Sequence, residues 1–281
     1  MNRLFSKVLV GAAALGCFCF PPASVAGQSA AVTPGNVDGS APRAMAADGH
    51  VDLTGTWTGS ANMGAPQDPN NIKVGVRARG GDYTNFERDN TLLRRMDQNR
   101  PWYKPQYWDI VQRLDQEGNG RDPVYTCMPA GVPRMGPPVK IVQTPTEMLF
   151  FYQNPDTYRI IPMDGRPHSP DDQLEGTWKG ESRGRWERDT FIVDTVGFLS
   201  SSWLGIGGWI HGDNMHVVER FRRQGNALTW QATVEDPDYF LKPWTMNPRT
   251  VRLNPDPKAE LDESLPCSER DASHLVTKEH H

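Results

Sequence analysis

The sequence predicts a mainly β protein, built as a single antiparallel β-barrel or strongly curved sheet with one short helix and long covering loops. Three observations predict this fold. The 281-residue chain contains 26 Gly and 24 Pro, and both residues are costly inside helices. Short runs with strand character, bounded by turn residues, follow one another over 139–253. These runs leave no room for the amphipathic helices that a parallel α/β fold needs between its strands.

The first 26 residues have the pattern of a signal peptide. Arg3 and Lys7 precede the apolar run 8–20, and small residues lead to Ala26, the expected cleavage site. The apolar run is shorter than the ~20 residues that a membrane-spanning helix needs. We therefore expect a periplasmic or secreted protein without a membrane span. Lipid attachment at Cys17 is the alternative.

The chain after the signal peptide divides into a tether and one domain. Residues 27–49, rich in Ala, Ser, Gly and Pro, predict a flexible tether, and residues 50–281 predict a single domain. A short strand is expected over 52–57, and its Leu-x-Gly-Thr-Trp-x-Gly pattern returns at 174–180. We interpret the repeat as two separate strands that pack in the same way, rather than as a duplication. Apolar residues at helical spacing after a proline predict a helix near 105–115.

The other elements are predicted to be strands, because apolar and polar residues alternate between turn signals. They are expected at 140–144, 147–153, 158–162, 185–188, 190–198, 216–222, 227–235 and 251–253. The turns between the strands from 185 to 235 are short and contain Gly or Asp, so these strands are expected to form a meander.

Cleavage after Ala26 would leave two cysteines, Cys127 and Cys267. In an exported chain they predict one disulfide bond, which would fasten the C-terminal segment to the loop that carries Arg134. In the chain-entropy model such a long closed loop contributes roughly 4–5 kcal/mol to stability. Free thiols are the alternative, although no neighbouring His or Cys-x-x-Cys pattern indicates catalysis.

Composition and motifs exclude several function classes. The formal net charge of −4 argues against a nucleic-acid-binding protein, which usually has a basic surface. No Gly-x-Ser-x-Gly elbow, phosphate loop, dinucleotide fingerprint or zinc-finger spacing is present. We therefore expect no cofactor.

Four titratable residues are candidates for acid–base catalysis. Asp194 and Glu219 alternate in phase with apolar residues of their strands. A carboxylate on an apolar face is either paired or has a raised pKa suited to proton donation. His211 and Asp213 have the composition of a general acid–base pair. The alternatives are satisfied structural carboxylates and a solvated loop.

Metal binding is the further alternative for this region. His211 and His216 lack the helical spacing of metalloprotease ligands, so we expect no metal there. The segment 115–120 is similar to the first half of a calcium loop. Its twelfth position is Thr126 instead of Glu, so a turn is the better interpretation.

Two Pro-rich loops, 100–105 and 131–138, present aromatic residues and a cation with little loss of conformational entropy. We expect them to rim a ligand pocket, with the Gly-rich segment 201–209 as its flexible lid. Plugs that cover the sheet are the alternative. The residues expected to bind substrate are Trp102, Tyr103, Arg134, Trp203, Trp209 and His216.

The chain resembles a family of exported bacterial proteins that open with an Asp-Leu-Ser-Gly-x-Trp type of motif, here Asp52–Trp57. The resemblance covers most of residues 52–276. Further matching motifs are Arg100–Pro105, Cys127–Pro138, Ile141–Glu147, Gly184–Asp189, Val193–Phe198, His211–Phe221, Glu235–Pro237 and Pro266–Arg270.

The resemblance implies a lipocalin-like barrel related to enzymes similar to lignin-type benzylic (α-) aryl etherases. It thus implies an exported hydrolase or lyase that cleaves a small aromatic, ether-containing compound by acid–base chemistry in a barrel pocket. A non-catalytic periplasmic binding protein for small hydrophobic or aromatic ligands is one alternative. A carbohydrate or cell-envelope binding protein is the other.

Overall fold

The computed structural model describes residues 45–58, 99–117, 121–153, 157–171, 176–205 and 208–263. The expected signal peptide, Cys17, Cys267 and most of the expected tether lie outside these ranges. No helix within them is long and apolar enough to cross a membrane.

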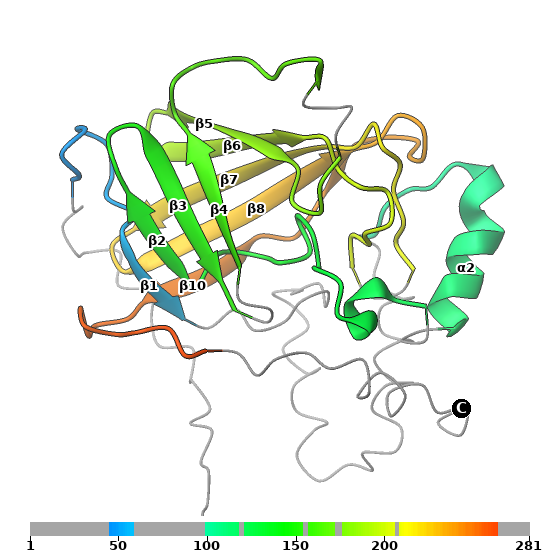
Figure 1. Ribbon diagram of the computed structural model, residues 1–281, viewed down its shortest axis with the longest axis horizontal. Helices are drawn as coiled ribbons and strands as arrows, with labels where there is room; N and C mark the ends of the chain where they lie inside the picture. Colours follow the sequence, from blue (N-terminus) through cyan, green and yellow to red (C-terminus); the bar gives the residue numbers. More distant parts are fainter. Residues whose placement is uncertain are drawn as a thin grey trace, which may run out of the picture. The chain divides into compact units, whose positions relative to one another are not determined.

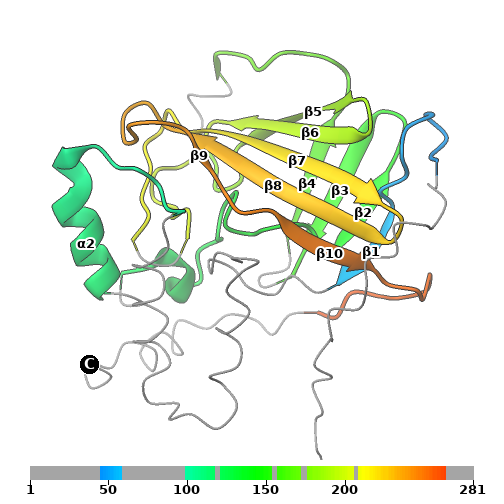
Figure 2. The ribbon, with the colours of Figure 1, turned by 180° about the vertical axis from the view of Figure 1, so that it is seen from behind.

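The described chain forms one antiparallel sheet that nearly closes into a barrel, as Figures 1 and 2 show from opposite sides. Its strands are β1 (Gly55–Thr58), β2 (Lys140–Gln143), β3 (Glu147–Tyr152), β4 (Thr157–Pro162), β5 (Glu181–Glu187), β6 (Thr190–Val196), β7 (His216–Gln224), β8 (Ala227–Glu235), β9 (Trp244–Thr245) and β10 (Arg249–Leu253). Their order around the sheet is β4-β3-β2-β1-β10-β8-β7-β6-β5, with β9 paired to β8. The predicted fold class is confirmed.

The meander of β5 to β8 is present as predicted, and local chemistry explains its turns. Two-residue turns join β5 to β6 and β7 to β8, and their first residues, Arg188 and Gly225, have φ of 58° and 59°. A positive φ suits the twist of a two-residue hairpin. Gly197, with φ 70°, follows the last residue of β6, so this strand is shorter than predicted.

Several predicted boundaries differ from the structure, and the helix and strand β5 are the two clearest cases. The expected helix is divided into a 3₁₀ turn, Pro105–Tyr107, and helix α2, Trp108–Glu117. Strand β5 begins at Glu181 rather than at 185. Its inward positions near the start are the small residues Ser182 and Gly184, so hydrophobic alternation could not reveal them.

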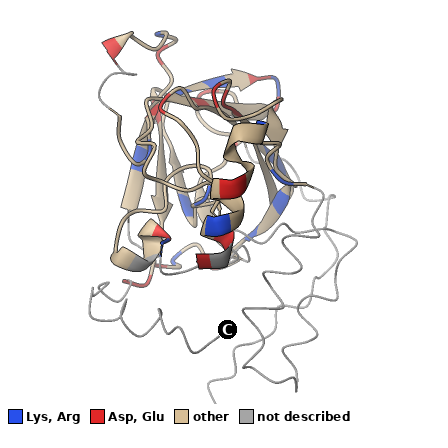
Figure 3. Ribbon diagram, turned by 90° about the vertical axis from the view of Figure 1, so that its right-hand side faces the viewer, with Lys and Arg blue, Asp and Glu red and all other residues tan. Residues whose placement is uncertain are grey.

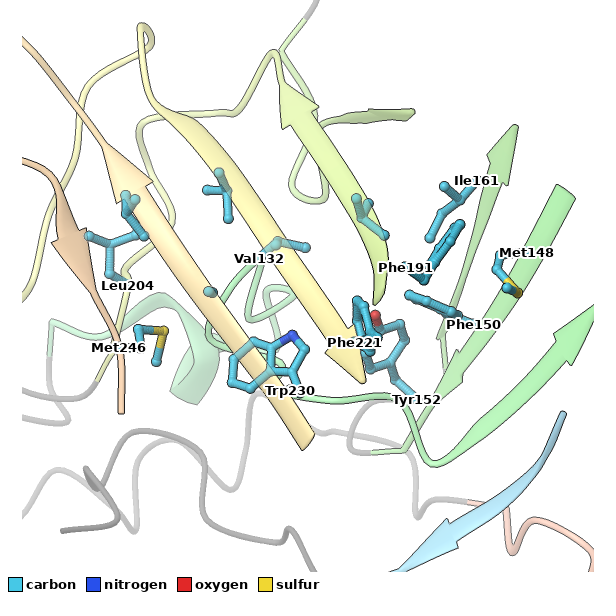
Figure 4. Packing of buried hydrophobic residues seen from close by; sticks show 14 of the residues in the cluster. Val132, Met148, Phe150, Tyr152, Ile161, Phe191, Leu204, Phe221, Trp230 and Met246 are labelled. Atoms are coloured by element: carbon cyan, nitrogen blue, oxygen red, sulfur yellow. The ribbon is translucent and has the colours of Figure 1, made fainter. Parts of the chain in front are cut away.

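Large side chains fill the interior of the barrel. Trp57, Phe150, Phe191, Phe221 and Trp230 are each at most 2% exposed. The ring centroid of Phe150 lies 4.9 Å from that of Phe221 and 6.3 Å from that of Phe191, and Figure 4 shows these three rings together. They occupy the centre of the barrel, where the sequence analysis expected a substrate.

The barrel has one seam, which lies between β4 and β5. Nine strands follow the path from β4 to β5, each antiparallel to the next, so the two edge strands run in the same direction. Among the described residues, no ladder of backbone hydrogen bonds joins them. Lys179 crosses the seam instead, because its Nζ donates to Thr157 Oγ1 at 3.0 Å and to the carbonyl oxygen of Tyr158 at 2.7 Å.

A buried ion pair also closes the seam from within. Arg159 on β4 donates from Nη1 to Glu219 Oε2 on β7 at 2.7 Å, and from Nη2 to Ser182 Oγ on β5 at 2.8 Å. Trp230 Nε1 donates to the other oxygen of Glu219 at 3.0 Å. Arg159 is 5% exposed and Glu219 1%. These hydrogen bonds join β4 to β5 and β7 across the gap in the ladder.

A substitution at Gly184 tests how tightly the side chains pack at the seam. A Cβ added there would lie 2.6 Å from Phe191 Cζ and 3.0 Å from Ile161 Cγ2. We expect Gly184→Ala to lower the free energy of unfolding by about 1–3 kcal/mol, because the core must shift to admit the methyl group. Urea denaturation measures this loss. An unchanged midpoint would mean that the seam is looser than described.

Candidate functional site

Several loops pack together over one end of the barrel, beside helix α2 (Figure 1). We call this the loop-covered end; it comprises residues 99–104, 129–138, 199–205, 208–215 and 236–243. Figure 3 looks onto it, with the acidic and basic residues of α2 in view.

Hydrogen bonds and burial hold these loops in place. Tyr103 donates its hydroxyl to the carbonyl oxygen of Ile210 at 2.7 Å. Tyr103 and Trp203 are each 6% exposed and Trp209 8%. In the described residues the loops are therefore plugs over the sheet, which is the alternative that the sequence left open for them.

Trp102 and Arg134 have different surroundings. Trp102 is 53% exposed, and Lys242 Nζ lies 3.8 Å from the centroid of its ring. Arg134 is buried and donates two hydrogen bonds to Asp122, at 2.7 and 2.6 Å. Asp122 therefore neutralises the cation that was expected at a pocket rim, and the pair fixes the loop that carries it.

His211 belongs to a buried network. Its Nδ1 lies 2.8 Å from the carbonyl oxygen of Gly212, and its Nε2 lies 2.7 Å from Ser202 Oγ. A carbonyl only accepts, so Nδ1 carries the proton and Nε2 accepts from Ser202. Burial lowers the pKa of His211, and Asp236 accepts from the Gly212 amide at 2.6 Å. The neutral imidazole therefore ties two loops together, whereas Asp213 is exposed at the surface.

The two candidate carboxylates lie on opposite faces of the sheet. Val193 pairs in register with Glu219, and Asp194 pairs with Val218. Paired residues share a face and successive residues alternate. Glu219 therefore points into the barrel while Asp194 points outward, so these carboxylates do not face one site.

Asp194 instead forms an outer-face cluster with two histidines, His168 and His216. The Nε2 atoms of His216 and His168 lie 2.9 and 3.1 Å from the same oxygen, Oδ1 of Asp194. Because a carboxylate only accepts, both Nε2 atoms donate. On its other side, Nδ1 of His216 lies 3.6 Å from Glu235 Oε2. The side chains of His168, Asp194 and His216 are 17%, 24% and 32% exposed.

The electrostatics of this cluster suit proton transfer. The hydrogen bond from His216 lowers the pKa of Asp194 below 3.8, and the same bond raises the pKa of His216 above 6.5. Near neutral pH the carboxylate is ionised and the imidazole is shifted toward its protonated form. A half-exposed imidazole of this kind is able both to donate and to accept a proton.

The pH dependence of stability tests the Asp194–His216 pair. The lowered pKa of Asp194 adds stability above pH 3.8, and this is lost as the pH falls through the lowered value. The raised pKa of His216 adds stability below pH 6.5, and this is lost as the pH rises through the raised value. The contribution is therefore largest between about pH 4 and 6.5.

We expect Asp194→Asn to lower the free energy of unfolding by less than about 1 kcal/mol at about pH 5.5, because solvent screens a half-exposed pair. The difference should shrink at about pH 8.5. Urea denaturation of both proteins at the two pH values measures it. An equal loss at both would contradict the ion pair.

Two other sequence predictions concern metals and cysteines. No group of three or more His, Cys, Asp or Glu side chains in the described ranges is arranged to hold a metal ion.

Cys127 is disulfide-bonded, and the cysteines it could pair with all lie outside those ranges. Its pairing with Cys267 therefore stays a prediction.

No protein-family model, curated protein or solved structure gave a match to this chain. The resemblance to exported etherase-like proteins therefore stays an expectation, and function has to be argued from the site.

The sequence analysis missed His168 and Ser202 as site residues. Neither stands in a periodic pattern, and each is recognised only by the side chain that the fold places beside it.

Proposed function

We propose that this protein is an exported enzyme that cleaves a small aromatic, ether-containing compound by acid–base chemistry at the outer-face cluster. One observation supports this most directly: two accessible imidazoles share one carboxylate oxygen. Of the four predicted catalytic residues, Asp194 alone makes an ion pair at an accessible surface. The ether class of substrate follows from the family resemblance.

The proposed reaction uses His216 first as an acid and then as a base. The imidazolium gives its proton to the ether oxygen, the benzylic C–O bond breaks, and a phenol leaves. Water adds to the benzylic carbon and returns a proton to His216, so the products are one phenol and one alcohol. Asp194 orients the ring and stabilises the imidazolium.

A non-catalytic binding protein is the second candidate function. Trp102 is 53% exposed at the loop-covered end, and Trp108, the first residue of the neighbouring helix α2, is 59% exposed. Exposed tryptophans offer faces on which the rings of a ligand stack. This function predicts that ligand is retained and that no product forms.

The deciding experiment is incubation of the mature protein with a panel of lignin-type aryl ether dimers, followed by mass spectrometry. We expect product from the wild-type protein and from Asp109→Asn, a control at an exposed acid on α2. We expect none from Asp194→Asn. Bound but unchanged ether would favour the binding protein, and full turnover by Asp194→Asn would place any reaction elsewhere.

A further inference from the structure

Of the buried arginines in the described chain, one lacks an acceptor for its guanidinium group. The buried arginines are Arg134, Arg159, Arg223 and Arg249. The first three donate hydrogen bonds to oxygen acceptors, which belong to Asp122, Glu219 and the carbonyl groups of Asp52 and Gly225. Arg249 is 3% exposed, and no hydrogen bond or ion pair joins its guanidinium to any residue that the structure describes.

The guanidinium of Arg249 lies inside the barrel, beneath the loop 131–138. Arg249 is the first residue of β10 and pairs in register with Trp230. Its guanidinium carbon lies 5.5 Å from the centroid of the Trp230 ring. A Cβ added at Gly136 would lie 3.1 Å from its Nη1. Figure 4 shows Trp230 between Phe221, in the aromatic core, and Met246, on the side of the loops.

A buried guanidinium without an anion is energetically costly. The face of Trp230 offsets only part of this cost. Glu219, on the other side of Trp230, is already engaged by Arg159 and by the indole Nε1. Burial lowers the pKa of Arg249 to about 10, so the side chain stays charged at neutral pH. Among the residues that the structure describes, therefore, no negative charge balances Arg249.

We propose that Arg249 and Trp230 form a binding site for a small aromatic carboxylate. The planar fork of an arginine matches the two oxygens of a carboxylate. The neighbouring indole and the buried side chains of Met246 and Val251 suit an apolar ring. The site is inside the barrel and the outer-face cluster is outside it, so this inference goes beyond the proposed function.

Calorimetric titration of the mature protein with benzoate tests the site. Benzoate should bind, and benzamide, its neutral analogue, should not. Arg249→Met should weaken benzoate binding roughly tenfold to a hundredfold. Arg220→Met, at an exposed arginine of β7, should bind as the wild type does. Equal binding by Arg249→Met, or tighter binding of inorganic phosphate than of benzoate, would overturn the proposal.

Thermal unfolding gives a readout that does not depend on turnover. Without added anion, Arg249→Met should melt at the same temperature as the wild type or higher, because the variant removes a buried charge that no described residue balances. Benzoate should raise the melting temperature of the wild type and leave that of the variant unchanged. An equal shift in both proteins, or no shift in either, would overturn the site even if ether cleavage is observed.

Discussion

Replacing Glu219 by alanine should lower the free energy of unfolding by about 3–5 kcal/mol, which is the usual effect of breaking a buried ion pair. The change leaves Arg159 charged inside the barrel without its carboxylate, and it leaves Trp230 Nε1 without an acceptor. It also weakens the seam, since Arg159 bonds β7 through Glu219.

Urea denaturation of the wild type, Glu219→Ala and the double variant Arg159→Met, Glu219→Leu measures this effect. The double variant removes both charges and fills their space, so it should recover much of the lost stability. A loss below about 1 kcal/mol in Glu219→Ala would contradict the role of the pair at the seam. Retained stability with lost turnover would instead support the catalytic role that the sequence suggested for Glu219.

Replacing His216 by glutamine should reduce ether turnover by roughly 10²–10⁴-fold, the usual contribution of a general acid–base residue. Glutamine keeps a hydrogen-bond donor for Asp194 but carries no titrating proton. Stability should therefore change by less than about 1 kcal/mol, which separates a chemical role from a structural one. Steady-state kinetics together with urea denaturation give both quantities.

The pH dependence of kcat/KM should also depend on His216. Because His216 acts as an acid with a raised pKa, kcat/KM of the wild type should fall as the pH rises through that pKa. This limb should be absent from the residual activity of His216→Gln. His50→Gln is the matched control, since His50 stacks on Trp186 with ring centroids 4.7 Å apart. Full kcat/KM in His216→Gln would exclude the proposed acid.

The sequence predicted the direction in which Glu219 points but not the residues that surround it. Its phase with Val217 and Phe221 correctly indicated an inward carboxylate. Its partner Arg159 is 60 residues away in the sequence, so no local pattern connects them. Strand β6 is a harder case, because Ile192 on the outer face and Val193 on the inner face are both fully buried. Alternation on such a strand does not say which face is the interior, and the direction of Asp194 could not be predicted.

The arginines show the same limit. Arg134 was expected to bind substrate at a pocket rim because of its Pro-rich loop, yet it is buried and paired with Asp122. Nothing in the sequence indicated that Arg249 is buried, because an arginine next to a proline in a short strand is typical of an exposed edge. Only the register of β10 with β8 turns it inward against Trp230.

The sequence by itself determined the fold class, the positions of most strands and the turns of the meander. Each of these depends on interactions between near neighbours, namely period-two alternation and the backbone preferences of turn residues. The tertiary structure alone decided the seam, the pairing of Arg159 with Glu219, the meeting of His168 with Asp194 and His216, and the burial of Arg249 away from every described carboxylate. These depend on register and on barrel closure, which bring together charges far apart in the chain and determine which of them are balanced.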